Sequence, residues 1–275
     1  MALLKISEVF GNDTSLSLDS KERKRAHCPF RQSACTKQGI TDPLGTCSLS
    51  DGETATVICP VRFLQGGRLF SDAGLVAFGR GQRVIAVPEF KLLEIPATAS
   101  QKKKKIGKVD FLLAQLDEHD RAVNFAALEV QSVYISGLTT RPAFKHYLRT
   151  GELSVEDRRR PDFRSSAQKR LMPQLALKVP IFRRWGKRFF VAIDSTLFAT
   201  LPAMTETSVG NAEITWLVYT FAKQAQGGYV MLPPKILHTN WEDVVNALRE
   251  GSPPEQSELM RWLSDQARWK AIHLT

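Results

Sequence analysis

All four cysteines of the 275-residue chain, Cys28, Cys35, Cys47 and Cys59, lie within one 32-residue window. Each one lies among turn-forming residues, so loops are expected to hold the sulfur atoms. Four thiolates suit a tetrahedral soft or borderline metal ion, whereas disulfides are rare in a reducing cytoplasm. The window therefore predicts a structural metal site with four cysteine ligands, and buried free thiols are the alternative.

The spacing of the cysteines does not identify the metal. Six, eleven and eleven residues separate successive cysteines, unlike the paired CxxC segments of a zinc ribbon. Sulfur ligands accept either zinc or iron. His27, next to the first cysteine, is expected at the surface rather than on the metal. Metal binding would stabilise a segment that has little to bury by itself.

The charge of the chain points to an anionic partner. There are 38 Lys and Arg against 28 Asp and Glu, which gives a net charge of +10 and a pI near 9.6. The first 200 residues contain 32 basic and 20 acidic side chains, with basic runs at 21–25, 102–105, 158–160 and 183–188. Basic side chains that neutralise phosphates release counterions, which favours nucleic-acid binding. A solvated basic surface explains the same charge equally well.

Hydropathy and composition indicate a globular protein of one large or two modest domains. Hydrophobic residues make up 43% and charged residues 24% of the chain, which is typical of folded domains. No uncharged apolar run approaches the roughly 18 residues of a membrane-spanning helix. The first residues show no signal-peptide cleavage pattern. We therefore expect a cytoplasmic protein that makes no membrane contact.

Segments with strand and helix patterns alternate after the cysteine window. Strands are predicted at 83–87, 90–95, 188–193 and 214–221, and a hairpin is predicted from 107–116 and 122–131 around a turn at 117–120. Helical spacing occurs at 167–184, 240–250 and 254–272, while 97–105 and 148–166 have the composition of loops. This order predicts an α/β fold with a central sheet, flanking helices and a metal module in front.

Two acidic residues of the predicted hairpin share one face of the sheet. With a symmetric four-residue turn, Asp110 faces Ala127 and Glu129 is a diagonal neighbour of Asp110. A register error of two residues would keep both on one face, and an error of one would reverse it. Gln131 follows Glu129 by two positions and therefore lies on that face as well.

These residues suit a magnesium-dependent reaction at phosphate. Two carboxylates and the carbonyl of Val130 offer the oxygen ligands that Mg²⁺ prefers. The ion would offset charge on a scissile phosphate, which predicts phosphodiester hydrolysis. Gln131 cannot be a general base because an amide does not titrate, so its expected role is to orient the attacking water. The proton acceptor stays open, and the alternative is that Asp110 and Glu129 are surface residues at a strand edge.

In its order of motifs, the chain resembles the NotI-like restriction endonucleases of the PD-(D/E)XK nuclease superfamily. The resemblance is carried by CPF at 28–30, CTK at 35–37, GTCS at 45–48, ICPVRF at 58–63, GKVDFLLA at 107–114 and LEVQSVYISG at 128–137. It covers roughly residues 26–140 and continues more weakly through 167–194.

The resemblance implies a homodimeric, Mg²⁺-dependent type II restriction endonuclease of a prokaryotic restriction-modification system. Such an enzyme cuts both strands of double-stranded DNA at a GC-rich palindrome. Its fold is a restriction-endonuclease-like mixed sheet flanked by helices. The expected domains are a basic, mobile or weakly helical arm at 1–25, a four-cysteine module at 26–70, and a catalytic core with a helical C-terminal part at 71–275.

The resemblance also assigns roles to individual residues. Cys28, Cys35, Cys47 and Cys59 would hold a structural iron, with zinc as the alternative. Asp110 and Glu129 match the acids of the first and second catalytic strands, and Gln131 falls where the superfamily usually has Lys. A further upstream acid is expected at Glu94, with Glu89 as the second candidate.

Two other functions stay open beside the restriction endonuclease. One is a non-catalytic DNA-binding protein with the same metal module, and the other is a repair or structure-selective nuclease. Arg141, Arg158 and Arg164 follow the second catalytic strand, but phosphate contact or solvation is the expected role of each rather than base reading. The apolar segments of the acidic C-terminal tail would either supply a dimer interface or be buried in the monomer.

Overall fold

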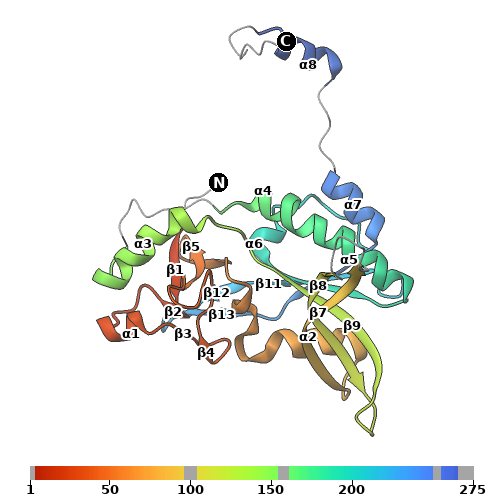
Figure 1. Ribbon diagram of the computed structural model, residues 1–275, viewed down its shortest axis with the longest axis horizontal. Coiled ribbons are helices and arrows are strands. Elements are labelled where there is room, and N and C mark those ends of the chain that lie inside the picture. The colour runs from red at the N-terminus through yellow and green to blue at the C-terminus, as the bar shows by residue number, and fades with distance from the viewer. Residues whose placement is uncertain (1–3, 96–103, 154–160, 250–254, 266–275) are drawn as a thin grey trace.

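The computed structural model describes residues 4–95, 104–153, 161–249 and 255–265. They form two six-stranded sheets, a short two-stranded sheet and helices packed around them (Figure 1). The predicted mixed α/β class is therefore confirmed. No helix within these ranges is long and apolar enough to cross a membrane.

The larger strands form a mixed sheet in the order β14-β11-β10-β9-β8-β7. β9, β10 and β11 run parallel, and the other neighbouring pairs are antiparallel. The bounds of these strands are Arg83–Ile95 (β7), Lys104–Leu116 (β8), Ala122–Gln131 (β9), Phe189–Asp194 (β10), Ile214–Tyr219 (β11) and Lys235–Thr239 (β14). The two strands predicted at 83–87 and 90–95 are thus one strand, in which Glu89 has a left-handed φ of 63°.

Both faces of this sheet are covered, and β10 is buried on each of them. Its alternate residues Val191 and Ile193 belong to one hydrophobic cluster, and Phe190 and Ala192 to the other. The first cluster includes α5 (Met172–Arg184) and the second α2 (Arg68–Phe78), which lie on opposite sides of the sheet in Figure 1. Parallel strands buried on both faces have such continuous apolar sequences.

The second sheet has the order β13-β12-β6-β5-β1-β2, with every neighbouring pair antiparallel. Its strands are Lys5–Val9 (β1), Asn12–Asp13 (β2), Thr46–Ser50 (β5), Thr54–Val57 (β6), Phe221–Lys223 (β12) and Tyr229–Met231 (β13). Between them, His27–Cys28 (β3) pairs with Ser33–Ala34 (β4). Residues from both ends of the chain therefore build one sheet.

The N-terminal segment differs from the mobile or weakly helical arm that the sequence led us to expect. β1 pairs with β5 in the second sheet, and Ile6 and Val9 are buried. Only Ser20–Lys24 (α1) is helical. The strand β1 contains few apolar residues and therefore shows no recognisable sequence pattern. Its burial depends on partners more than 35 residues away.

Helices connect the strands, and several of them cover the sheets, but the last described helix lies apart from the sheets and buries none of its residues (Figure 1). Besides α1, α2 and α5 they are Pro60–Gly67 (η1, a 3₁₀ segment), Gly137–Thr150 (α3), Phe163–Ser165 (α4), Ser166–Leu171 (η2, a π-helical turn), Ser195–Phe198 (α6), Trp241–Arg249 (α7) and Gln256–Leu263 (α8). The helical predictions at 167–184 and 240–250 are confirmed, and α8 begins within the third, whose last residues lie outside the described part. Pro173 lies in the first turn of α5 and Pro180 does not end that helix.

A buried ion pair joins the second sheet to the segment after the last cysteine. Arg62 Nε lies 2.9 Å from Glu8 Oε2, and both side chains are at most 2% exposed. The guanidinium also donates to the carbonyl of Tyr229, and its carbon lies 4.4 Å from the ring centroid of Phe30 and 4.9 Å from that of Phe221. One side chain therefore contacts β1, β13, β12 and the cysteine-containing segment.

A second buried carboxylate connects the two sheets. Asp194, at the end of β10, accepts hydrogen bonds from the backbone N–H of Val57 in β6 at 3.2 Å and from Leu197 N–H at 2.8 Å. It is fully buried, and burial raises the pKa of its carboxyl group to about 6.

This carboxyl group predicts a pH dependence of stability. Because an unfolded aspartate titrates near 3.8, the folded state alone retains the proton between pH 4 and 6, so the free energy of unfolding falls as the pH rises through that window. In chemical denaturation, the free energy of unfolding of Asp194→Asn should fall less between pH 4 and 7 than that of the parent, by about 3 kcal/mol. Asp51→Asn, which changes an exposed aspartate, should parallel the parent; equal slopes for the parent and Asp194→Asn would contradict the assignment.

Candidate active site

The hairpin of β8 and β9 brings Asp110 and Glu129 together. Phe111 pairs with Leu128, and the same register continued by one residue sets Asp110 opposite Glu129. The backbone N–H of Val130 donates to Asp110 Oδ2 at 2.9 Å. The two acids predicted to share one face are therefore neighbours on adjacent strands.

The register differs by two residues from the expected one. The loop spans five residues, since Leu116 pairs with Ala122. The register of the two strands shifts between Gln115 and Leu116. The Asp117 side chain holds this loop by accepting from the N–H groups of His119 and Arg121, each at 2.9 Å. Asp110 consequently does not face Ala127, but a shift of two keeps each side chain on its face.

A lysine from α5 contacts this pair. Lys178 Nζ lies 2.6 Å from Glu129 Oε1, with side chains 4% and 3% exposed, and it also donates to Gln174 Oε1 at 2.8 Å. Motif spacing does not predict this residue, because it lies 49 positions beyond Glu129. A signal was present, since Lys178 falls on the buried stripe of the helix with Leu171, Leu175 and Phe182.

Burial and nearby negative charge raise the pKa of both carboxyl groups of this pair. Burial and the charge of Asp110 together raise the pKa of Glu129 to about 7, against the opposing effect of Lys178. Burial also raises the pKa of Asp110, against the Val130 hydrogen bond and the charge of Lys178. Glu129 Oε2 is buried and has no hydrogen-bond partner among the described residues.

A cation would resolve this arrangement. Divalent ions favour carboxylate and carbonyl oxygens, and Asp110, Glu129 and the Val130 carbonyl meet that requirement. The donor set fits Mg²⁺ because one buried carboxylate oxygen lacks a partner. Gln131 is buried at the end of β9, and its Nε2 donates to the carbonyl of Ser132 at 2.8 Å.

The two candidates for the upstream acid lie at different places along β7. Glu89 lies between residues that pair with Phe111 and Val109, next to Asp110, and its charge contributes to the raised pKa of Asp110. It is exposed and forms an ion pair with Lys108 at 2.5 Å. The backbone of Glu94 pairs with Lys105, five residues farther along, while its side chain lies outside the described part.

Charge interactions link the cysteines in pairs, and Lys37 interacts with Cys35, Cys47 and Cys59. Burial and the neighbouring Cys59 and Cys28 raise the pKa of Cys35, and burial and Cys59 raise that of Cys47. Lys37 Nζ donates to the carbonyls of Thr46 and Ile58, the residues just before Cys47 and Cys59, at 2.6 and 3.0 Å. The thiols are chemically suited to a soft metal, but no three ligand-type side chains of the described residues are placed together to hold an ion.

Other predicted positions lie apart from the acidic pair. Arg141 forms an ion pair with Asp42 at 2.7 Å, Arg164 is exposed, and Arg158 lies outside the described residues.

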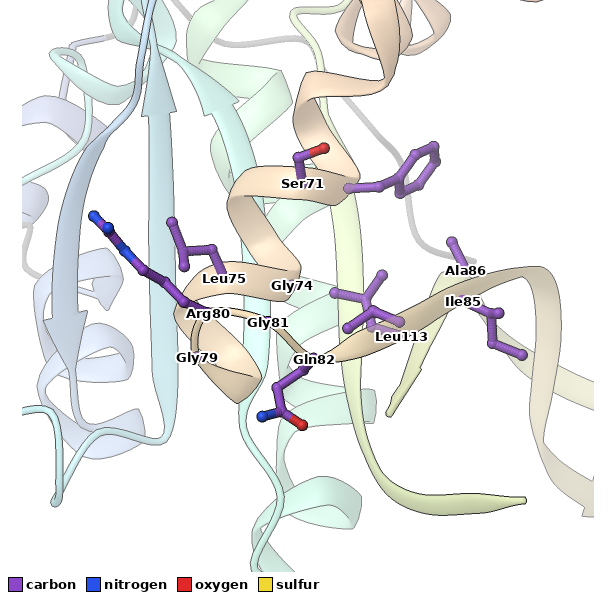
Figure 2. A pocket seen from close by; sticks show the side chains of 12 residues that line it. Ser71, Gly74, Leu75, Gly79, Arg80, Gly81, Gln82, Ile85, Ala86 and Leu113 are labelled. Carbon is purple, nitrogen blue, oxygen red and sulfur yellow. The ribbon is translucent and has the colours of Figure 1, made fainter. Parts of the chain in front are cut away.

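A cavity of about 410 Å³ between α2 and β7 is lined by residues that include Leu75, Arg80, Ile85 and Leu113 and by no carboxylate (Figure 2). This cavity therefore lacks the groups needed for phosphate hydrolysis.

A comparison with protein families gives an independent indication of function. The model of the family described as restriction endonuclease NotI matches residues 8–232. A comparison with curated proteins finds no match. The matched range includes the four cysteines, the β8–β9 hairpin and Lys178, and it covers most of the chain. The chain therefore belongs to the NotI restriction endonuclease family, whose members are type II site-specific deoxyribonucleases.

Proposed function

We propose that Asp110 and Glu129 bind Mg²⁺ and that the enzyme uses this site to hydrolyse both strands of duplex DNA at a GC-rich palindrome. The observation that supports this most strongly is the buried, unpartnered Oε2 of Glu129 beside a second carboxylate. Leaving a charged acceptor buried without a partner is costly. A divalent ion between the two strands removes that cost and offers a binding point for a phosphate oxygen.

Each residue of the site has a separate task in this proposal. Bound Mg²⁺ would supply a Lewis acid that offsets charge on the scissile phosphate. Asp110 and Glu129 hold the ion with the Val130 carbonyl. Gln131 orients the attacking water, since its amide oxygen accepts a hydrogen bond but does not titrate.

Lys178 supplies the amine that is missing from position 131. Its Nζ contacts Glu129 Oε1 and thereby fixes the carboxylate so that Oε2 faces the ion site. It is a positioning residue, because its contact is with Glu129. The supply of this amine by α5 explains how the PD-(D/E)XK pattern operates with Gln131 in place of Lys.

The arrangement of strands supports a PD-(D/E)XK type of fold. The acids lie on adjacent antiparallel strands, α5 covers the same face, and β10 returns parallel to β9. We assign residues 71–275 to this catalytic core, with Glu89 or Glu94 of β7 as the further acid.

We further propose that the module at 26–70 binds iron through Cys28, Cys35, Cys47 and Cys59, with zinc as the alternative. The chemistry of four thiols within one short segment supports this assignment, as does the proximity of Cys35 to Cys28 and Cys59 and of Cys47 to Cys59. Lys37 lies beside them and would offset part of the charge of four thiolates. The metal would hold the β3–β4 segment against β5 and β6.

A homodimer fits a palindromic target, because two-fold DNA symmetry favours a two-fold protein. The C-terminal tail divides into two parts. Val244 and Ala247 of α7 are buried, whereas Leu259 and Met260 of α8 are 46% and 54% exposed. The exposed apolar side chains of α8 support the proposal that this part of the tail contacts a second copy.

Removal of either acid tests the site. Asp110→Asn and Glu129→Ala should abolish Mg²⁺-dependent cleavage of plasmid DNA while DNA binding in a gel-shift assay persists, because the ion site is lost and the basic surface is not. Glu118→Gln, in the turn of the same hairpin, should cut as the parent does. Discrete fragments distinguish a restriction enzyme from a repair nuclease, and undiminished cutting by either acid variant rejects the site.

Lys178 should affect turnover rather than DNA affinity. Lys178→Met is expected to lower kcat roughly 10²–10³-fold with an unchanged Kd for DNA, and Lys178→Arg should recover part of the rate because it keeps the charge. Arg184→Met, at the exposed end of the same helix, is the control and should retain its kcat. Equal rates for Lys178→Met and the parent in single-turnover cleavage would exclude the positioning role.

Elemental analysis tests the cysteine module. The purified full chain should contain stoichiometric iron and show iron–thiolate absorption, and Cys47→Ser should lose both because a ligand is missing. Ser33→Ala, in the β3–β4 turn region, should keep its metal. Zinc as the only native metal would contradict the iron assignment, and a metal-free native protein would contradict the module.

A further inference from the structure

A cavity of about 480 Å³ lies beside the acidic pair at the carboxyl end of β9. Its walls include Gln131 and Tyr134 from the end of β9, Lys169 and Arg170 from η2, and Gln174 from α5. Parallel sheets commonly bind ligands beyond the carboxyl ends of their strands. Gln131 is two residues from Glu129, and Gln174 accepts a hydrogen bond from Lys178, so the cavity adjoins the proposed site.

The lining of this cavity is cationic. Lys169 and Arg170 are exposed, and Lys37 enters from the cysteine module. No Asp or Glu lines the cavity, and neither Lys169 nor Arg170 forms an ion pair within the described ranges. Unpaired cations in a concave site attract an anion.

The position of Tyr134 is fixed from two directions. Its backbone N–H donates to Ser166 Oγ at 2.7 Å, and its carbonyl accepts from Asp162 N–H at 3.1 Å. The guanidinium carbon of Arg170 lies 3.9 Å from the centroid of the Tyr134 ring. The ring face is therefore occupied by the arginine, which limits its use for stacking on a base.

The helix that supplies the two cations is itself unusual. Residues 166–171 form a π-helical turn between α4 and α5. Such turns have poorer backbone geometry than an α-helix and occur frequently at functional sites. Here the turn lies with Ser166 buried against Tyr134 and with Lys169 and Arg170 at the cavity.

We propose that this cavity binds a backbone phosphate that neighbours the scissile phosphate on the same DNA strand, with Lys169 and Arg170 as its charged partners. The inference rests on the proposed function, because it takes the acidic pair as the point of cleavage. An unpaired guanidinium and an ammonium suit phosphate oxygens. The Arg170–Tyr134 contact holds the guanidinium in place before DNA binds.

The test begins with the parent enzyme and a defined plasmid. Sequencing of the digested ends locates the scissile bond. Absence of a defined cut would refute the proposed function at this first step, before the cavity is tested. Duplexes with the mapped site are then made with a neutral methylphosphonate at one phosphate next to the scissile bond, and binding is measured in an Asp110→Asn background.

The Asp110→Asn protein should lose roughly ten-fold in affinity on the methylphosphonate duplex. With Lys169→Ala and Arg170→Ala added, the protein should bind the normal duplex about as weakly as the Asp110→Asn protein binds the modified duplex, and it should lose no further affinity on the modified duplex. The dependence of its DNA affinity on salt concentration should have a slope smaller by roughly one. Lys235→Ala, on the far edge strand β14, is the matched control and should stay sensitive to the methylphosphonate. If the methylphosphonate lowers DNA affinity equally with and without Lys169→Ala and Arg170→Ala, so that the two losses add, the proposal is overturned.

Discussion

Repulsion between two carboxylates on adjacent strands is the constraint that organises the proposed active site. Asp110 and Glu129 lie opposite one another, Glu129 is buried, and the charge of Asp110 makes Glu129 harder to ionise. Lys178 offsets part of this charge from one side, through Oε1 of Glu129. The other oxygen, Oε2, has no hydrogen-bond partner among the described residues, and it is there that we propose a cation binds. The pair of carboxylates can therefore accept one more positive charge. In the proposed function, a DNA phosphate in contact with the bound cation would lie beside Asp110 and Glu129.

The frame around the site depends on a different buried charge. Arg62 joins Glu8 to the Tyr229 carbonyl and to the rings of Phe30 and Phe221. A guanidinium is suited to this role because it is planar, always charged, and able to donate in several directions. Removal of one partner of such a pair leaves an uncompensated charge, which is more costly than the pair itself. The segment that holds the cysteines is consequently fixed to the second sheet by side chains as well as by any metal.

Local geometry explains which parts of the site could be predicted from the sequence. Asp110 and Glu129 were found because period-two alternation preserves the face of a strand even when the turn is misjudged by two residues. Lys178 and the strand β1 were not, because each acquires its role from partners far along the chain. The π-helical turn before α5 also lacks a sequence pattern of its own. The family comparison supports the type of enzyme. The roles of Glu94 and of the proposed ions depend on side-chain and ligand positions, which a comparison of sequences does not contain.

The pairing of β6 with β12 has a consequence for synthesis of the protein. Residues 54–57 acquire this neighbour only when residues 221–223 have left the ribosome. Contacts between such distant segments form slowly compared with those of a local hairpin. The β8–β9 hairpin can therefore form early, while the second sheet is completed only after residues 221–223 have been synthesised. A nascent chain interrupted before that point would lack the strand that β6 pairs with on one side, and its second sheet would stay incomplete.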